Sequence, residues 1–321
     1  MDQVKEPDTL QEAVVYFANP DNCLSYLAGR RWPTGVVTCP RCGSKNVGFI
    51  ASRRMWQCKT RHPLAQFSIK VGTIFEDSPL GLDKWLPAMW MIASDRNGIS
   101  SWELHRALGV TQKTAWFMLH RIRLAMQDEQ TGGKLAGEVE VDESFIGGKA
   151  RNMHADKRAQ KIQGRGPEGK AIVAAVLERG GKVRAKVVKS RRKPELHAMV
   201  REHVEPGSAL YSDALMSYDG LSEEYAHQVI DHAVSYVEGN VHTNNCENFW
   251  SLLKRGLKGT YVSVEPFHLF RYVDEQAFRY NNRKPMSDAE RFSFLVDKIV
   301  GKRLTYDGLI GKMEEKKPEA V

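Results

Sequence analysis

The sequence predicts an α/β protein in which a mixed five-stranded sheet flanked by helices follows two smaller N-terminal modules. Two observations lead to this fold class. Cysteines pair at short spacing within the first 75 residues, and the hydrophobic periodicity changes after a glycine-rich polar segment at residues 127–137. The chain has 321 residues, of which 42% are hydrophobic and 27% charged, so it can build more than one folded domain.

A metal-binding module is predicted at residues 35–75. Cys39 and Cys42 form a CPxCG turn, and Cys58 and His62 follow after a gap of fifteen residues. Zinc binds four thiolate or imidazole ligands at the corners of a tetrahedron, and short-spaced pairs from two turns supply such a set. The module has a small apolar core that needs a metal to be stable. We therefore expect one structural Zn²⁺ ion.

A helix-turn-helix is predicted within residues 82–127. A first helix has apolar residues at helical spacing from residue 82, and a serine-capped helix at 100–108 follows it. A Gly-Val turn then leads into a helix capped by Thr111. A simple helical hairpin is the alternative interpretation. In a helix-turn-helix, the last helix presents its N-terminal polar residues to a DNA major groove. Those residues are Gln112, Lys113 and Thr114.

The sheet is predicted from alternating or continuous apolar runs after residue 137. The expected strands are 138–148, 171–178, 182–189, 209–213 and 227–231, and the expected helices are 194–204 and 245–256. This order of elements is the topology of an RNase H-like domain. Its first and fourth strands are neighbours at the centre of the sheet.

Three acidic residues occupy informative positions on this map. Asp142 lies within the first strand, Asp213 ends the fourth strand, and Glu247 opens the last helix. Clustered carboxylates repel one another and bind hard cations, so we expect two Mg²⁺ or Mn²⁺ ions suited to phosphoryl transfer. Lys254 lies seven residues after Glu247, on the same helix face, where it can bind a phosphate. Taken singly, each acid also fits an ordinary role on a solvated strand or at a helix N-terminus.

Charge is distributed unevenly along the chain. The formal net charge is +8 and the pI is about 9.1. Residues 30–70 carry +9 and residues 149–193 carry +12, which leaves 8 − 9 − 12 = −13 for the remainder. Two basic segments favour a polyanionic partner such as DNA, although a solvated lysine-rich face is the alternative. Arg53 and Arg54 of the first segment are candidate DNA contacts.

Nothing in the sequence suggests a membrane or secreted protein. The longest purely apolar run is Ile172 to Leu177, and the N-terminus has early acids without an apolar signal core. Cys23 and Cys246 are expected to be plain small apolar residues. These features predict a reduced, cytoplasmic protein associated with the nucleoid.

Several segments resemble bacterial insertion-sequence transposases of the DDE class that carry an N-terminal zinc ribbon, the ISXO2-like type. The segments span residues 20 to 290 and read CPRCG with WQCK, QFSIKVGTIFEDSPLGLDKW, EVDESFIGGK, LYSDALMSY, VHTNNCENFWSLLKRGLKGTY and FRYVDEQAFRYNNRK. The resemblance implies an RNase H-like core, two divalent ions, and cut-and-join chemistry at transposon ends. Asp142, Asp213 and Glu247 match the acidic triad of the family, and Lys254 matches the lysine that follows the third acid.

Two departures from the family pattern bear on the sites. The second zinc turn, CKTRHPLAQF, is longer than the usual CxxC form, so His62 stands as a substitute for the fourth ligand. Some relatives have asparagine in place of the third acid, and Asn244 is therefore a rival for Glu247 or an addition to it.

The expected function is that of a transposase. It would bind terminal inverted repeats, hydrolyse a phosphodiester with metal ions, and join the freed 3′ end to target DNA as a homodimer or larger assembly. The alternatives are a zinc-ribbon regulator that binds DNA without chemistry and an RNase H-like nuclease that cuts without joining. The expected divisions are a helical segment (1–34), the zinc ribbon (35–75), the helix-turn-helix (82–127), the catalytic domain (137–300) and a tail (301–321).

Overall fold

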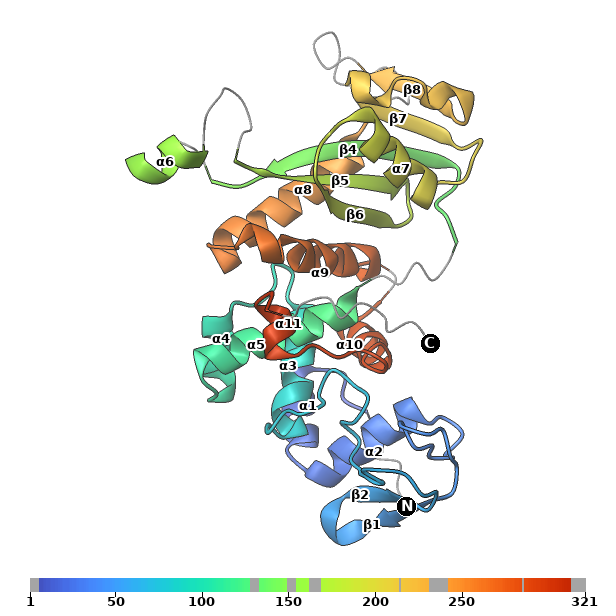
Figure 1. Ribbon diagram of the computed structural model, residues 1–321, viewed down its shortest axis with the longest axis vertical. Coiled ribbons are helices and arrows are strands. Elements are labelled where there is room, and N and C mark those ends of the chain that lie inside the picture. The colour runs from blue at the N-terminus through green and yellow to red at the C-terminus, as the bar shows by residue number, and fades with distance from the viewer. Residues whose placement is uncertain are drawn as a thin grey trace. The chain divides into compact units, whose positions relative to one another are not determined.

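The structure, a computed structural model, divides into two compact units. Its described residues are 6–127, 133–148, 154–161, 169–213, 215–230, 242–284 and 286–312. The first unit comprises Met1–Gln127 together with Arg283–Val321, and the second comprises Asp128–Asn282 (Figure 1). Among the described residues, no helix combines the length and the apolar character needed to cross a bilayer.

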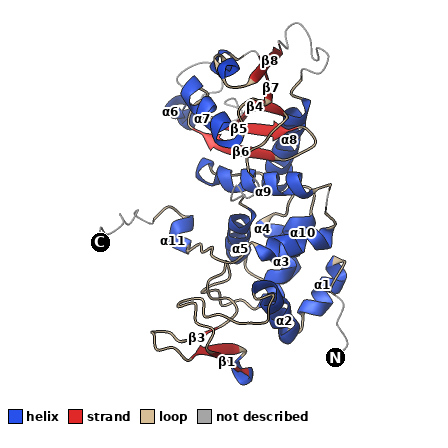
Figure 2. Ribbon diagram, turned by 90° about the vertical axis from the view of Figure 1, so that its right-hand side faces the viewer, coloured by secondary structure: helices blue, strands red, loops and turns tan. Residues whose placement is uncertain are grey.

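The first unit is helical except for a small ribbon (Figure 2). The ribbon strands are antiparallel and are β1 (Val47–Ile50), β2 (Met55–Cys58) and β3 (Gln66–Phe67). The helices are α1 (Leu10–Phe17), α2 (Pro20–Arg31), α3 (Leu82–Ser94), α4 (Ser101–Leu108), α5 (Gln112–Met126), α10 (Asp288–Asp297) and α11 (Tyr306–Leu309).

An aromatic cluster joins the two ends of the chain within this unit. Phe292 of α10 lies 4.8 Å from Trp90 of α3, and 5.8 Å from both Phe17 of α1 and Tyr26 of α2, measured between ring centroids. The Tyr26 hydroxyl also lies 3.0 Å from the hydroxyl of Ser293. Aromatic side chains bury a large apolar area, so α10 completes a core that the N-terminal helices begin.

The pair α4 and α5 is defined at its ends by local sequence. Ser100 and Glu103 form a capping box at the start of α4. Gly109 ends α4 with φ of 66°, a left-handed conformation that glycine adopts without steric cost. The Thr111 side chain then accepts a hydrogen bond from the Thr114 N–H and caps α5. The expected pair of helices with a tight glycine turn is therefore present.

The second unit contains the predicted mixed five-stranded sheet. Its strands are β4 (Glu138–Ile146), β5 (Ala171–Glu178), β6 (Val183–Val188), β7 (Ala209–Asp213) and β8 (Ala226–Ile230). They lie in the order β6-β5-β4-β7-β8. The β4–β5 and β5–β6 pairs are antiparallel, and the β4–β7 and β7–β8 pairs are parallel. Every strand begins and ends within two residues of its expected bounds.

Alternation along the strands gives the sheet two different covered faces. One face, with Val139 and Val141 of β4, packs against α7 (Lys193–His203). The other face, with Val173 and Ala175 of β5, packs against α8 (Asn244–Gly256) and α9 (Leu269–Asn282). Since side chains alternate along a strand, the even-numbered residues of β4 share the face covered by α8. The short helix α6 (Ala155–Lys161) follows β4.

Truncation of Phe292 tests the role of α10 in the first unit. Phe292 is 1% exposed, so Phe292→Ala removes a fully buried ring and should lower the free energy of unfolding by about 3–5 kcal/mol. Urea denaturation followed by tryptophan fluorescence would measure the loss, because Trp90 contacts this ring. Val15→Ala, at a position of α1 that is 72% exposed, is the control and should change stability by less than about 0.5 kcal/mol. A Phe292→Ala protein as stable as this control would contradict the packing.

Candidate functional site

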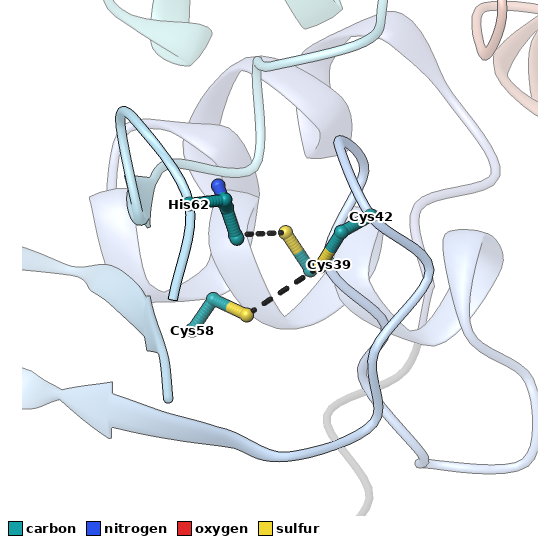
Figure 3. A group of neighbouring side chains, drawn as sticks. All are labelled: Cys39, Cys42, Cys58 and His62. Atoms are coloured by element: carbon teal, nitrogen blue, oxygen red, sulfur yellow. Dashed lines mark hydrogen bonds between the residues drawn. The ribbon is translucent and has the colours of Figure 1, made fainter. Parts of the chain in front are cut away.

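Three cysteines and one histidine converge in the ribbon. The ligand atoms of Cys39, Cys42, Cys58 and His62 all lie within 4.8 Å of one another. Figure 3 shows the side chains pointing toward a common centre from the Cys39–Cys42 turn, from Cys58 at the end of β2 and from His62 in the segment that follows. The Cys39 Sγ lies 3.5 Å from the His62 Nε2, and the Cys42 Sγ lies 3.7 Å from the Cys58 Sγ. The spacing seen in the sequence therefore corresponds to one compact group.

Backbone hydrogen bonds shape both halves of this group. The Gly43 N–H donates to the Cys39 carbonyl at 2.9 Å, and Gly43 adopts φ of 70°, which closes the CPxCG turn. On the other half, the Cys58 N–H donates to the carbonyl of Ala65 at 2.8 Å. These bonds hold the ligands without help from a large core.

The imidazole of His62 has the protonation pattern that a zinc ligand needs. Its Nδ1 lies 2.7 Å from the carbonyl oxygen of Pro63, which can only accept, so Nδ1 carries the proton. The lone pair of Nε2 is then free on the side of Cys39. A backbone carbonyl that fixes the tautomer in this way is a common partner of metal-bound histidine. Three thiolates and this imidazole fit a structural zinc ion.

The two remaining cysteines take no part in this group. Cys23 is buried and its Sγ donates to the Phe17 carbonyl at 3.1 Å, while Cys246 is fully buried under the sheet. Burial raises the pKa of the Cys23 thiol to about 12, so it stays protonated and unreactive. Both behave as the small apolar residues that the sequence suggested.

Asp142 and Asp213 lie on the same face of the sheet in neighbouring strands. The parallel pairs of β4 with β7 run from Glu138–Ala209 to Glu140–Tyr211, an offset of 209 − 138 = 71 residues. The two acids are separated by the same number, 213 − 142 = 71. Continued by two residues, this register sets Asp142 opposite Asp213. Residues opposite each other in parallel strands point to the same face, which here is the face covered by α8.

The Asp142 carboxylate is held on both oxygens. Trp250 of α8 donates its Nε1–H to Oδ2 at 2.8 Å, and the Glu143 N–H donates to Oδ1 at 2.8 Å. Burial raises the pKa of Asp142 to about 7; the Trp250 bond opposes this shift, and the charges of Glu143 and Asp213 add to it. No ion pair among the described residues involves Asp142 or Asp213. Within the described part of the chain, no cationic side chain therefore pairs with these two carboxylates.

Glu247 and Lys254 are exposed on α8, and so is Asn244 at the first position of that helix. Glu247 lies one residue after buried Cys246, whose N–H donates to a carboxylate of β4. Among the described residues, the three acids are not gathered as closely as the four zinc ligands are. The described contacts thus bring Asp142 near Asp213, and they tie the helix that carries Glu247 to the same strand.

Sequence reasoning missed several residues around the acids. Glu140 is fully buried beneath the start of α8, and Trp250 contacts Asp142 directly. Glu143 points to the opposite face, where it accepts a hydrogen bond from Tyr218 at 2.8 Å, and burial raises its pKa. The alternating acids at 138, 140 and 142 were a usable signal for Glu140, since they share one face. The solvated-strand interpretation of this segment is wrong for Glu140.

The candidate DNA contacts of α5 lie at its first turn as expected. Gln112 donates its side-chain amide to the Ser101 hydroxyl at 2.9 Å, which joins α5 to α4. Lys113 is exposed, and its Nζ lies 4.9 Å from the ring centroid of Tyr306. The Thr114 hydroxyl pairs with that of the N-cap threonine at 2.8 Å. Lys113 is the most accessible of the three.

The two candidate arginines of the ribbon have protein partners. Arg54 forms an exposed two-contact pair with Asp21, at 2.5 and 3.1 Å. Arg53 donates to the side chain of Gln66 at 2.9 Å. Exposed pairs contribute little stability, so either guanidinium can exchange its partner for a phosphate.

The described basic residues of the second segment differ in their surroundings. Residues 149–153 and 162–168 of it lie outside the described residues. Arg184 is largely buried and donates to the Gly133 carbonyl at 2.6 Å. By contrast Lys182, Lys186 and Lys189 are exposed along β6. Part of the charge counted in the sequence therefore supports the fold.

Comparison with known proteins bears on both units. Residues 134–281 match the family model of the ISXO2-like transposase domain, and residues 18–60 match that of a transposase zinc-ribbon domain. A transposase-like protein of Haemophilus influenzae is 32% identical over 116 residues, which cover 36% of this chain and 94% of that protein. The chain belongs to the ISXO2-like transposase family.

A second relative extends the similarity along the chain. A protein from the transposable element ISH50 of Halobacterium salinarum is 29% identical over 254 residues, which cover 75% of this chain and 84% of that protein. The matched zinc-ribbon residues end at 60, before His62. In this ISXO2-like transposase the fourth member of the Cys/His group therefore lies outside the segment that matches the family model.

Metal analysis of the transposase tests the zinc group. The purified chain should contain about one zinc per molecule, and Cys58→Ser should lose it, because three ligands do not close a tetrahedral site. His62→Ala should release zinc to a chelator faster, whereas His62→Cys should retain it. Cys23→Ala, outside the group, is the matched control and should keep its zinc. If His62→Ala releases zinc to the chelator as slowly as the native chain does, the fourth zinc ligand is a residue other than His62.

The raised pKa of Asp142 predicts a pH-dependent stability. Since the folded pKa is above the ordinary value of 3.8, ionised Asp142 costs stability, and this cost grows as pH rises toward 7. Asp142→Asn should therefore be more stable than the native chain at pH 8, by about 2–4 kcal/mol in magnesium-free buffer without chelator. The gap should shrink at pH 5. Urea denaturation at both pH values measures it.

Trp250→Phe should change stability in the opposite direction to Asp142→Asn in the same measurement. It removes the hydrogen bond that favours the charged carboxylate, so it should cost more stability at pH 8 than at pH 5. If the difference in unfolding free energy between each variant and the native chain is the same at pH 5 and pH 8, Asp142 does not titrate in this range.

Proposed function

We propose that this family member is an active insertion-sequence transposase with an RNase H-like catalytic core. The observation that carries the proposal is the common 71-residue offset of the β4–β7 register and of Asp142 from Asp213. Two carboxylates on neighbouring central strands, beneath a helix that supplies a third, suit the binding of two Mg²⁺ or Mn²⁺ ions. The proposed ligands are Asp142, Asp213 and Glu247, with Asn244 as a further candidate.

The electrostatics of Asp142 among the described residues support this assignment. Burial raises the pKa of Asp142, and the negative charge of nearby Asp213 adds to that shift. Hard divalent cations relieve such repulsion and prefer carboxylate oxygens. When bound, these ions would activate the attacking oxygen and stabilise the leaving one.

The residues of the chain have defined tasks in this chemistry. Trp250 and the Glu143 N–H orient the Asp142 carboxylate and leave a further lone pair on each oxygen. Lys254, exposed two turns after Glu247, binds a DNA phosphate. Water attacks a phosphodiester at the transposon end and frees its 3′-hydroxyl. That hydroxyl then attacks target DNA, where one phosphodiester forms as another breaks.

We further propose that the first unit recognises the transposon ends. In this proposal α4 and α5 act as a helix-turn-helix that inserts α5 into a major groove, and Gln112, Lys113 and Thr114 face the bases. The zinc ribbon adds phosphate contacts through Arg53 and Arg54. Since two ends must be joined, the DNA-bound form is at least a dimer, and it works at the bacterial chromosome in the cytoplasm.

Removal of single acids tests the catalytic assignment. Asp142→Ala, Asp213→Ala and Glu247→Ala should each lower the rate of metal-dependent strand transfer more than about a hundredfold. Each variant loses a proposed ligand of metal ions that stabilise the transition state by several kcal/mol. Binding to labelled transposon ends should persist in all three. A gel assay with labelled oligonucleotides and Mg²⁺ measures cutting and joining together.

The same assay separates the alternative functions. Glu223→Gln, an exposed carboxylate of the second unit, is the control and should retain activity. A native chain that cuts without joining would be a nuclease, and one that binds ends without cutting would be a regulator. Persistent joining by any acid variant would remove that residue from the catalytic set.

A further inference from the structure

Glu140 is a fully buried carboxylate two residues before Asp142. It is 0% exposed and lies on the sheet face that α8 covers. A buried charge is costly unless hydrogen bonds and an opposite charge compensate it. Glu140 therefore needs partners, and most of them come from the beginning of α8.

The carboxylate of Glu140 caps the N-terminus of α8. Its Oε2 accepts the backbone N–H groups of Asn245 and Cys246 at 2.9 and 3.1 Å, and its Oε1 accepts the Asn245 side-chain amide at 2.8 Å. The residue at the N-cap position, Thr243, makes no side-chain cap hydrogen bond. The first N–H groups of a helix have no partner within it and carry partial positive charge, so an anion placed there stabilises the turn.

Arg179 completes the compensation and adds a second link to the helix. Its Nε donates to the Oε1 of Glu140 at 2.9 Å, and its Nη2 donates to the carbonyl of His242 at 2.8 Å. The ring of His242 also lies close, with its Nδ1 3.2 Å from the same Oε1. Strand β4, the turn after β5 and the entry to α8 thus meet at one carboxylate.

A second tie between β4 and α8 follows one turn later. Trp250 donates to Asp142, as described above. Glu247 lies between the two ties, one residue after Cys246 and three before Trp250. The ties before and after Glu247 therefore fix both the rotation of α8 about its axis and its position along β4.

We propose that Glu140 is a positioning residue that holds Glu247 at the metal site of Asp142. The inference rests on the proposed function, because it concerns the same site. Glu140 touches no reacting atom in this proposal. It acts through the first turn of α8, which would fray without its cap and allow Glu247 to move away from the sheet.

The test compares two buried glutamates in the zinc-loaded full chain. Glu140→Gln keeps the size of the side chain but removes the anionic cap. Glu275→Gln is the matched control, because Glu275 is also 0% exposed and also paired with an arginine, Arg279, in the second unit. Hydrogen exchange by mass spectrometry reports the opening of residues 244–253, and electron paramagnetic resonance of free Mn²⁺ reports metal binding without turnover.

The expected results differ between the two variants. Glu140→Gln should speed exchange in residues 244–253 and raise the apparent Mn²⁺ dissociation constant about tenfold or more, as loss of a residue supporting a metal ligand does. Glu275→Gln should lose stability yet bind Mn²⁺ as the native chain does. Zinc content should stay unchanged in both.

Other results would overturn the proposal in distinguishable ways. If Asp142→Ala abolishes Mn²⁺ binding but Glu140→Gln leaves it unchanged, the positioning role alone is refuted. If Glu140→Gln and Glu275→Gln weaken Mn²⁺ binding equally, the loss reflects general destabilisation, and the positioning role of Glu140 is also refuted. If Asp142→Ala leaves Mn²⁺ binding intact, the metal site fails, and the proposed function and the role of Glu140 fail together.

Discussion

The parallel pairing of β4 with β7 is the constraint on which the candidate catalytic site depends. It fixes a 71-residue offset between two strands that are distant in sequence, and it sets Asp142 and Asp213 on one face. A shift of one residue in this register would turn one acid to the face covered by α7. The alternation of Val139 and Val141 into that apolar core opposes such a shift, so the core of one face maintains the acids of the other.

The acids of β4 show how one strand can carry both a compensated and an uncompensated charge. Glu140 is neutralised by Arg179 and by the N-terminus of α8, and it can therefore serve as a structural anchor. The described residues give Asp142 only neutral hydrogen-bond donors, and burial raises its pKa. The modest net charge of +8 hides this separation. Some basic residues, such as Arg179 and Arg184, compensate buried charge or support loops, whereas the lysines on and beside β6 are exposed.

Local patterns were enough to predict much of the fold but not its tertiary connections. The five strands follow from alternation and apolar runs, and the ends of α4 and α5 follow from capping residues and Gly109. The zinc group follows from spacing alone. The return of α10 to the first unit could not be predicted, because Phe292 meets Phe17 and Trp90 only in the folded chain. The expected catalytic domain extended to residue 300, whereas contacts group residues 283–321 with the first unit. Glu140 looked solvated because its partners come from distant segments.

The four zinc ligands and the three candidate acids are arranged differently. The zinc ligands are gathered within 4.8 Å of one another, and a hydrogen bond to Pro63 fixes the His62 tautomer, so four protein ligands can surround one ion. A closed tetrahedral site holds a structural ion and leaves no position for substrate. Among the described residues the three acids are not gathered so closely, although α8 is tied to β4 on either side of Glu247. Mg²⁺ keeps several water or phosphate ligands, so in the proposed function acids at this wider spacing would leave room for DNA oxygens on the ions.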